Sequence, residues 1–211
     1  MKLILVRHGN TFETGEEAKQ VGSRTDLPLT ATGKKQARQM GDYLLSHNLL
    51  PTAIFTGPLV RQTESAQIIA QQLSIPTVLQ EPALTEIDYG LWEGLSSAAI
   101  SSRWPTEHAN WTHAGIWPSH IFEGSEEKHL ANIKRWLTQL RCTYEPQDIL
   151  LAISSNGIMR YFCNQRMDFA SCNKTEQLKV KTGHFCILEL TQEYLHTHLW
   201  NQNPASTPSQ V

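Results

Sequence analysis

Residues 2–9 read KLILVRHG, a short apolar run that passes directly into an Arg-His-Gly tripeptide. A continuously apolar run of this length is typical of a strand covered on both faces, as in a parallel sheet between layers of helices. Ligands of such sheets bind beyond the carboxyl ends of the strands. The polar residues that follow Val6 are therefore the first candidates for a functional site.

Strand and helix signals alternate along the rest of the chain. Apolar runs bounded by turn residues predict strands at residues 52–55, 76–79 and 148–154, and a C-terminal hairpin formed by residues 184–190 and 194–200. Apolar residues at helical spacing predict helices at residues 33–47, 58–73 and 126–141, and a further helix that begins near Gly157. This alternation predicts an α/β fold, a three-layer α/β/α sandwich with a mostly parallel central sheet.

Length and composition favour one folded domain. The chain has 211 residues, of which 40% are hydrophobic, so we expect a single domain over residues 1–200 and a disordered tail over residues 201–211. Lys and Arg number 18 against 20 Asp and Glu, a balance that argues against binding to nucleic acid or to a membrane surface. Four cysteines without CxxC spacing indicate reduced thiols and a cytoplasmic location.

Three strand ends carry residues suited to phosphate chemistry. Arg7 offers a planar fork that matches phosphate or carboxylate, and His8 is a possible nucleophile or acid–base group. Arg61 lies at the start of a helix, where a cation opposes the helix dipole unless an anion binds nearby. Glu86 follows the third strand and would serve as a general acid if a dry or anionic site raised its pKa.

Five separately spaced motifs occur in a recognisable order: RHGNT, TDLPLTATGKKQA, PLVR, LTEIDYGLWEG, and a strand that ends before GxxR. In this order the chain resembles the histidine phosphatase superfamily, in its phosphoglycerate mutase-like branch, over residues 1–190. The resemblance implies that His8 is the nucleophile, that Arg7 and Arg61 bind the phosphoryl group, and that Glu86 is the proton donor. It also implies the fold of that family, a small phosphorylated metabolite as partner, and no requirement for a metal or cofactor.

The loop after the first strand is expected to line the mouth of the pocket. It extends from Asn10 to Ser23, and Thr11, Thr14 and Gly22 are the predicted substrate contacts. Residues 95–124, rich in Trp, match no family motif and are expected to determine specificity.

The stretch ISSNGIMR, residues 153–160, departs from the family pattern. The family has a second catalytic histidine here, and Ser155, followed by Asn156, stands in its place. Both are neutral donors near a helix start, and we expect both to contact the phosphate. A charged hydrogen bond contributes about 1.5–3 kcal/mol and a neutral donor roughly half of that. We therefore expect the catalytic rate to be about tenfold to a hundredfold lower than with the second histidine. His184 is the candidate for a histidine that substitutes in space.

Three functions fit these residues. The first is a metal-independent phosphatase that acts on a small phosphomonoester through a phosphohistidine on His8. The second is a mutase of the phosphoglycerate type, which the absence of the second histidine disfavours. The third is a non-catalytic protein that binds a phosphorylated ligand. Ser155 supports this third function, whereas His8, Arg61 and Glu86 argue against it, because a binding protein needs neither a nucleophile nor a proton donor. No oligomeric state is predicted.

Overall fold

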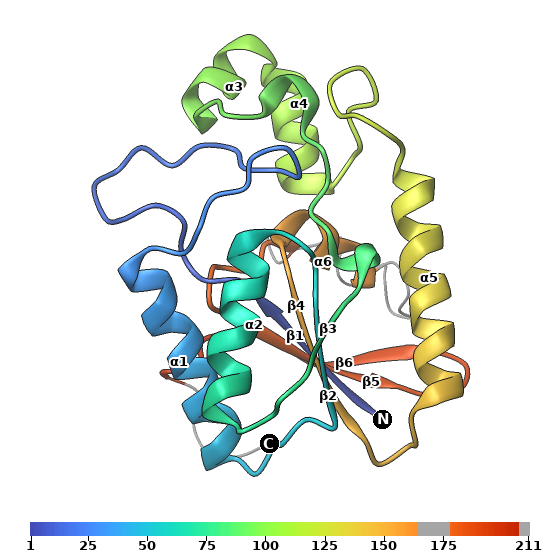
Figure 1. Cartoon of the computed structure of the whole chain (residues 1–211). Coiled ribbons are helices and arrows are strands. Elements are labelled where there is room, and N and C mark those ends of the chain that lie inside the picture. The colour runs from blue at the N-terminus through green and yellow to red at the C-terminus, as the bar shows by residue number, and fades with distance from the viewer. Residues whose placement is uncertain (164–177, 207–211) are drawn as a thin grey trace.

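The computed structural model describes residues 1–163 and 178–206. At its centre lies a six-stranded sheet in the order β3-β2-β4-β1-β5-β6 (Figure 1). The strands are β1 (Lys2–Arg7), β2 (Ala53–Thr56), β3 (Val78–Gln80), β4 (Ile149–Ser154), β5 (Phe185–Leu190) and β6 (Leu195–Gln202). The first four are parallel, and β5 and β6 add an antiparallel hairpin at the edge next to β1. The mostly parallel sheet predicted from the sequence is confirmed.

Helices cover both faces of this sheet (Figure 1). Helices α1 (Ala31–Ser46) and α2 (Val60–Gln72) lie on one face, and α5 (Glu126–Thr143) and α6 (Asn156–Cys163) lie on the other. The side chains of β1 alternate between the two cores: Leu3 and Leu5 pack on the side of α5, and the intervening Ile4 and Val6 pack on the side of α1 and α2. This alternation explains why the run is apolar at every position.

The C-terminal strand is longer than predicted. Strand β6 continues to Gln202, which pairs with Phe185, so residues 201–202 belong to the sheet and not to a tail. The mistake arises because Asn and Gln disfavour strands as isolated residues, whereas pairing with β5 extends the strand here. Residues 203–206 form a turn in which the N–H of Ser206 donates to the carbonyl of Asn203 at 3.1 Å, and residues 207–211 of the predicted tail lie outside the described residues.

Between β3 and α5 the chain forms several short helices. They are η1 (Pro82–Leu84), η2 (Gly90–Trp92), α3 (Ser97–Arg103), α4 (Pro105–Ala109) and a single π-helical turn, η3 (Asn110–Ala114). We call residues 95–124 the cap segment, because α3 and α4 lie above the sheet at the end where α6 begins (Figure 1). Phe122 holds this segment together through edge-on contacts with Trp92 and Trp111, each with ring centroids 5.0 Å apart.

Two glycines bring the loop after β1 against the start of α1. A Cβ on Gly9 would lie 2.3 Å from the carbonyl oxygen of Gly33, and a Cβ on Gly33 would lie 2.3 Å from that of Asn10. Backbone atoms cannot move aside as a side chain can, so both positions require glycine. This close approach fixes the path of the chain directly after His8.

Among the described helices, none is both long and apolar enough to cross a membrane.

Candidate active site

His8 lies at the carboxyl end of β1 and is 5% exposed. Its Nδ1 is 2.8 Å from the carbonyl oxygen of Gly9, which can only accept a hydrogen bond, so Nδ1 carries the proton and Nε2 carries the lone pair. The Nε of Arg61 donates to this Nε2 at 3.2 Å. Burial, with the charges of Arg7 and Arg61, holds the pKa of His8 well below its ordinary value. The result is a neutral imidazole, the form required of a nucleophile.

Arg61 is fully buried in the first turn of α2. Its guanidinium is held by backbone carbonyls of the loop between β1 and α1: Nη1 donates to Thr25 at 2.9 Å and Nη2 to Gly22 at 3.0 Å. One turn later, the hydroxyl of Ser65 donates to the carbonyl of Arg61 and accepts from the backbone N–H of Gly9. Helix α2 and the loop after β1 are thereby connected at the point where Arg61 meets the histidine.

Arg7 lies at the end of β1, on the other side of this centre. Its Nη1 donates to the carbonyl of Val180 at 2.7 Å, and its buried Nε has no hydrogen-bond partner within the described part of the chain. The N–H of Val180 in turn donates to Oδ1 of Asn156 at 2.8 Å. Asn156 therefore supports Arg7 through Val180, and a direct contact between Asn156 and the phosphate stays a prediction.

Glu86 is buried opposite these cations. Its Oε1 accepts from the N–H of Ile87 at 2.9 Å, and its Oε2 accepts from the N–H of Gly157 at 3.2 Å and from the hydroxyl of Tyr89 at 3.3 Å. Burial raises the pKa of Glu86, although Arg61 and the backbone donors oppose the rise. A raised pKa favours the protonated acid, the form that donates a proton.

Ser155 lies at the carboxyl end of β4, where it is fully buried. Its Oγ accepts from Nε2 of Gln62 at 2.9 Å. Gln62 is itself fixed, because the same nitrogen also donates to the carbonyl of Leu84 and its Oε1 accepts from the N–H of Leu59. The hydroxyl proton of Ser155 has no acceptor among the residues that the structure describes. Ser155 thus retains one donor that a ligand can use.

The remaining predicted residues lie around this centre without a direct side-chain contact to it among the described hydrogen bonds, and their contacts with substrate stay predictions. Gly22 reaches the centre through its carbonyl, which holds the guanidinium described above. Thr14 is exposed and Thr11 half-buried, and in the described chain no hydrogen bond joins either to the buried histidine, arginines or glutamate. Nδ1 of His184 contacts the carbonyl of Asn201 at 3.0 Å, and in the described chain no hydrogen bond joins its ring to His8, Arg61 or Glu86.

Three supporting residues were missed in the sequence. Tyr89 donates to Glu86, Gln62 donates to Ser155, and Ser65 connects α2 with the loop after β1. The sequence held a signal for each of them, because Tyr89 lies three residues after Glu86, and Gln62 and Ser65 occupy the buried face of a helix where apolar residues are the norm.

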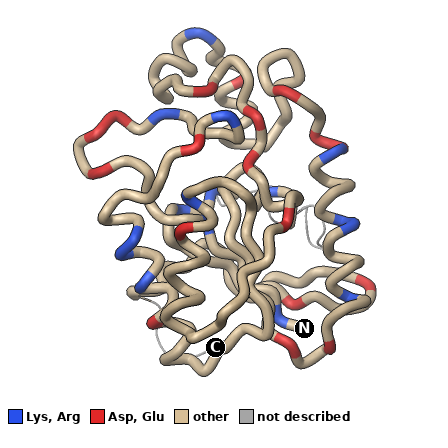
Figure 2. Tube along the Cα trace, viewed as in Figure 1, with Lys and Arg blue, Asp and Glu red and all other residues tan. Residues whose placement is uncertain are grey.

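The positive charge at this centre is local. Lys and Arg are interspersed with Asp and Glu along the visible trace, in keeping with totals of 18 and 20 (Figure 2). Arg61, which is buried, and Arg7, which is half-buried, therefore attract an anion to one point without making the surface basic.

Comparison with known proteins places this centre in a family. The model of the histidine phosphatase superfamily (branch 1) matches residues 3–203. The uncharacterized phosphatase PhoE of Bacillus subtilis is 38% identical over 103 residues, which are 49% of this chain and 51% of that protein, so the match spans about half of its length. Phosphoserine phosphatase 1 of Hydrogenobacter thermophilus is 27% identical over 168 residues, which are 77% of this chain and 75% of that protein.

Solved structures agree on the fold. A mycobacterial glucosyl-3-phosphoglycerate phosphatase has a TM-score of 0.77 and 19% identity, over 96% of this chain and 99% of that chain. The alpha-ribazole phosphatase of Shigella flexneri has a TM-score of 0.70 and 20% identity, over 96% and 97%. With the family model matched over nearly its whole length, the chain belongs to the histidine phosphatase superfamily, branch 1.

Proposed function

We propose that the protein is a metal-independent phosphatase that hydrolyses a small phosphomonoester through a phosphohistidine on Nε2 of His8. The observation that supports this function best is the state of His8: a buried, neutral imidazole whose Nδ1 is bound to Gly9 and whose Nε2 faces Arg61. A protein that only bound phosphate would need the arginines but not this lone pair. The phosphatases among its relatives support the same function.

In the first step, the Nε2 lone pair of His8 attacks phosphorus in line with the ester oxygen. The N–P bond forms while the P–O bond to the alcohol breaks, and Glu86 gives its proton to the departing oxygen. The Nε of Arg61, which donates to Nε2 in the free protein, transfers its hydrogen bond to a phosphoryl oxygen. The unpartnered Nε of Arg7 binds another oxygen, and the two cations offset the developing charge.

In the second step, water attacks the phosphohistidine. Glu86, now a carboxylate, accepts the proton of that water as the N–P bond breaks, so inorganic phosphate leaves and both residues return to their starting protonation states. The hydroxyl of Ser155, oriented by Gln62, donates to a phosphoryl oxygen where the family pattern has a charged histidine. A neutral donor stabilises the transition state less, so we propose turnover that is reduced but present.

Loss of the nucleophile tests this function. Purified wild-type protein is expected to hydrolyse p-nitrophenyl phosphate at the same rate with and without EDTA, and His8→Ala is expected to show no turnover above the uncatalysed rate. Phosphate release that EDTA abolishes would overturn the metal-independent mechanism. Equal turnover by the two proteins would instead favour a non-catalytic phosphate-binding protein.

The proton donor gives a prediction for pH and leaving group. Glu86 must be protonated for the first step, and its pKa is raised, so turnover is high below that raised pKa and falls as the pH rises through it. Glu86→Gln should remove this dependence and lower kcat/KM, which reports only the steps up to release of the alcohol, by about 10²–10⁴-fold on an alkyl phosphate such as glycerol 3-phosphate.

Hydrolysis of p-nitrophenyl phosphate supplies the control in the same variant, because p-nitrophenolate departs without a proton. We expect Glu86→Gln to lower kcat/KM far less on this ester, because kcat/KM does not include the attack of water, in which Glu86 acts as base for both esters. Equal losses on the two esters would show that Glu86 does not protonate the leaving group.

The adjacent residues Ser154 and Ser155 give a matched test of the position where serine replaces the second histidine of the family pattern. Ser155→Ala removes a free donor, and because a neutral hydrogen bond contributes about 0.5–1.5 kcal/mol, we expect kcat/KM to fall about threefold to tenfold. Ser154 is equally buried, but its hydroxyl donates to the carbonyl of Leu84 at 2.9 Å. Ser154→Ala should therefore lower the free energy of unfolding, measured in urea, and leave kcat/KM within twofold of the wild type. The reverse pattern would contradict the role given to Ser155.

A further inference from the structure

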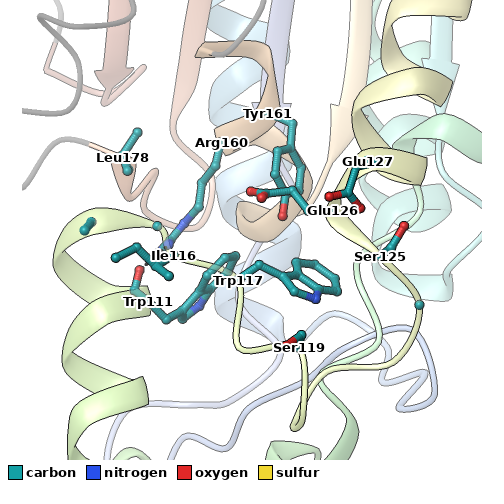
Figure 3. Close-up of a pocket in the computed structure, with 13 residues that line it drawn as sticks. Trp111, Ile116, Trp117, Ser119, Ser125, Glu126, Glu127, Arg160, Tyr161 and Leu178 are labelled. Atoms are coloured by element: carbon teal, nitrogen blue, oxygen red, sulfur yellow. Dashed lines mark hydrogen bonds between the residues drawn. The ribbon is translucent and has the colours of Figure 1, made fainter.

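A cavity of about 560 Å³ lies between the cap segment, helix α6 and the start of α5 (Figure 3). Its walls include Trp111 and Trp117 from the cap segment, Arg160 and Tyr161 from α6, and Glu126 from the first turn of α5. None of the four residues to which catalysis is assigned lines it. The cavity is therefore a feature that the proposed chemistry leaves unexplained.

Tyr161 provides the strongest indication that this cavity binds a ligand. The residue is 2% exposed and lines the cavity, yet its hydroxyl has no hydrogen-bond partner within the described chain. Burial, with the nearby charge of Glu126, raises the pKa of Tyr161 far above its ordinary value, so the hydroxyl stays neutral and can both donate and accept. A buried hydroxyl without a partner is destabilising, and a polar ligand in the cavity would satisfy it.

The lining of the cavity carries both hydrogen-bond donors and hydrogen-bond acceptors. The guanidinium carbon of Arg160 is 4.3 Å from the centroid of the Trp111 ring, and its Nη1 donates to the carbonyl of Trp111 at 2.8 Å, which holds the cation at the wall. Figure 3 shows Arg160 and Tyr161 extending from α6 toward the two Trp side chains. Glu126 and Glu127 contribute carboxylates from the start of α5.

The cavity adjoins the catalytic centre. Arg160 lies one turn after Gly157, whose N–H donates to Glu86. Tyr89, which also donates to Glu86, has its ring 6.4 Å from that of Trp111 in an edge-on contact. Tyr89 therefore contacts both the proton donor and Trp111 in the wall of the cavity.

The chemistry of the lining selects among ligands. Glu126 and Glu127 would repel a second anionic group, and Arg160 would repel a cationic one. A neutral polyol suits this lining, since its hydroxyls can donate to a carboxylate and accept from Tyr161. Its C–H faces pack against the Trp rings. We propose that the cavity binds the alcohol part of the phosphomonoester and that this alcohol is a polyol of sugar type, an inference that rests on the proposed function.

Binding to an inactive variant tests this directly. Glucose 6-phosphate and inorganic phosphate are titrated into His8→Ala, with tryptophan fluorescence or calorimetry as the readout. Because the sugar adds two or more hydrogen bonds, we expect it to bind at least about tenfold more tightly than inorganic phosphate. Equal affinities, or tighter binding of phosphoserine than of glucose 6-phosphate, would overturn the polyol assignment.

Two tyrosines provide the matched variants. Tyr161→Phe in the His8→Ala background should reduce the preference for glucose 6-phosphate over inorganic phosphate about threefold to tenfold, the effect of one lost hydrogen bond. Tyr43 is also buried, and its hydroxyl also lacks a partner in the described chain, but it packs against Phe185 on the other side of the sheet. Tyr43→Phe should leave the preference unchanged, and an equal loss in both variants would contradict the assignment.

The outcomes separate the two proposals. Turnover of p-nitrophenyl phosphate without a preference for the sugar phosphate would overturn only the polyol site. A preference for the sugar phosphate that depends on Tyr161, without turnover of any ester, would overturn the phosphatase function and retain the polyol site.

Discussion

The hydrogen bond between Nδ1 of His8 and the carbonyl of Gly9 determines what the rest of the site can do. It places the ring proton on Nδ1 and directs the lone pair of Nε2 at Arg61. The bond depends in turn on the path of the chain after β1, which the close contact between Gly9 and Gly33 holds in place. Burial then keeps the imidazole neutral beside two guanidinium groups.

The effect of the charged groups around His8 depends on how each group is held as well as on their number. Arg61 is held by backbone carbonyls and Arg7 by the carbonyl of Val180, and among the described residues neither cation forms an ion pair. Glu86 lies near both, and burial still raises its pKa. In a site of low dielectric, such fixed groups stabilise a transferring phosphoryl group more strongly than they would in water, because they need no reorganisation.

Much of the fold was predictable from the sequence for a simple reason. The run LILV is apolar at every position because its residues alternate between two cores, and parallel strands place their carboxyl ends at one edge. The residues that follow β1, β2 and β4 therefore converge in space whatever the details of the loops. Strand β6 was misjudged at its end, because pairing with β5 extends it past the residues that favour strands.

The partners of individual atoms were not predictable in the same way. The side-chain oxygen of Asn156 binds the N–H of Val180, which lies 24 residues away along the chain, and no motif indicated this contact. Ser155 stands where the motif predicts a ligand contact, yet its orientation depends on Gln62, 93 residues away. Such contacts depend on tertiary packing. The sequence pattern nevertheless identified the segment where the family motif changes.

The cap segment shows most clearly which features could not be predicted from the sequence. Its Trp residues suggested a covering element that determines specificity, and in the structure Phe122 joins Trp92 and Trp111 in a small aromatic core. The cavity beneath it exists because α6 contributes Tyr161 to the same space. No pattern in the sequence indicates that these two segments are in contact. They meet because the sheet positions α6 next to the cap segment.

Rapid-quench labelling measures phosphoryl transfer to His8 most directly. The protein is mixed with a radiolabelled phosphomonoester, denatured in base within the first turnover, and digested for peptide mapping. We predict label on the peptide that contains His8, stable in base, released by acid and absent from His8→Ala. Phosphate release in the first turnover without any protein-bound label, or label on a serine or a carboxylate, would contradict a phosphohistidine mechanism.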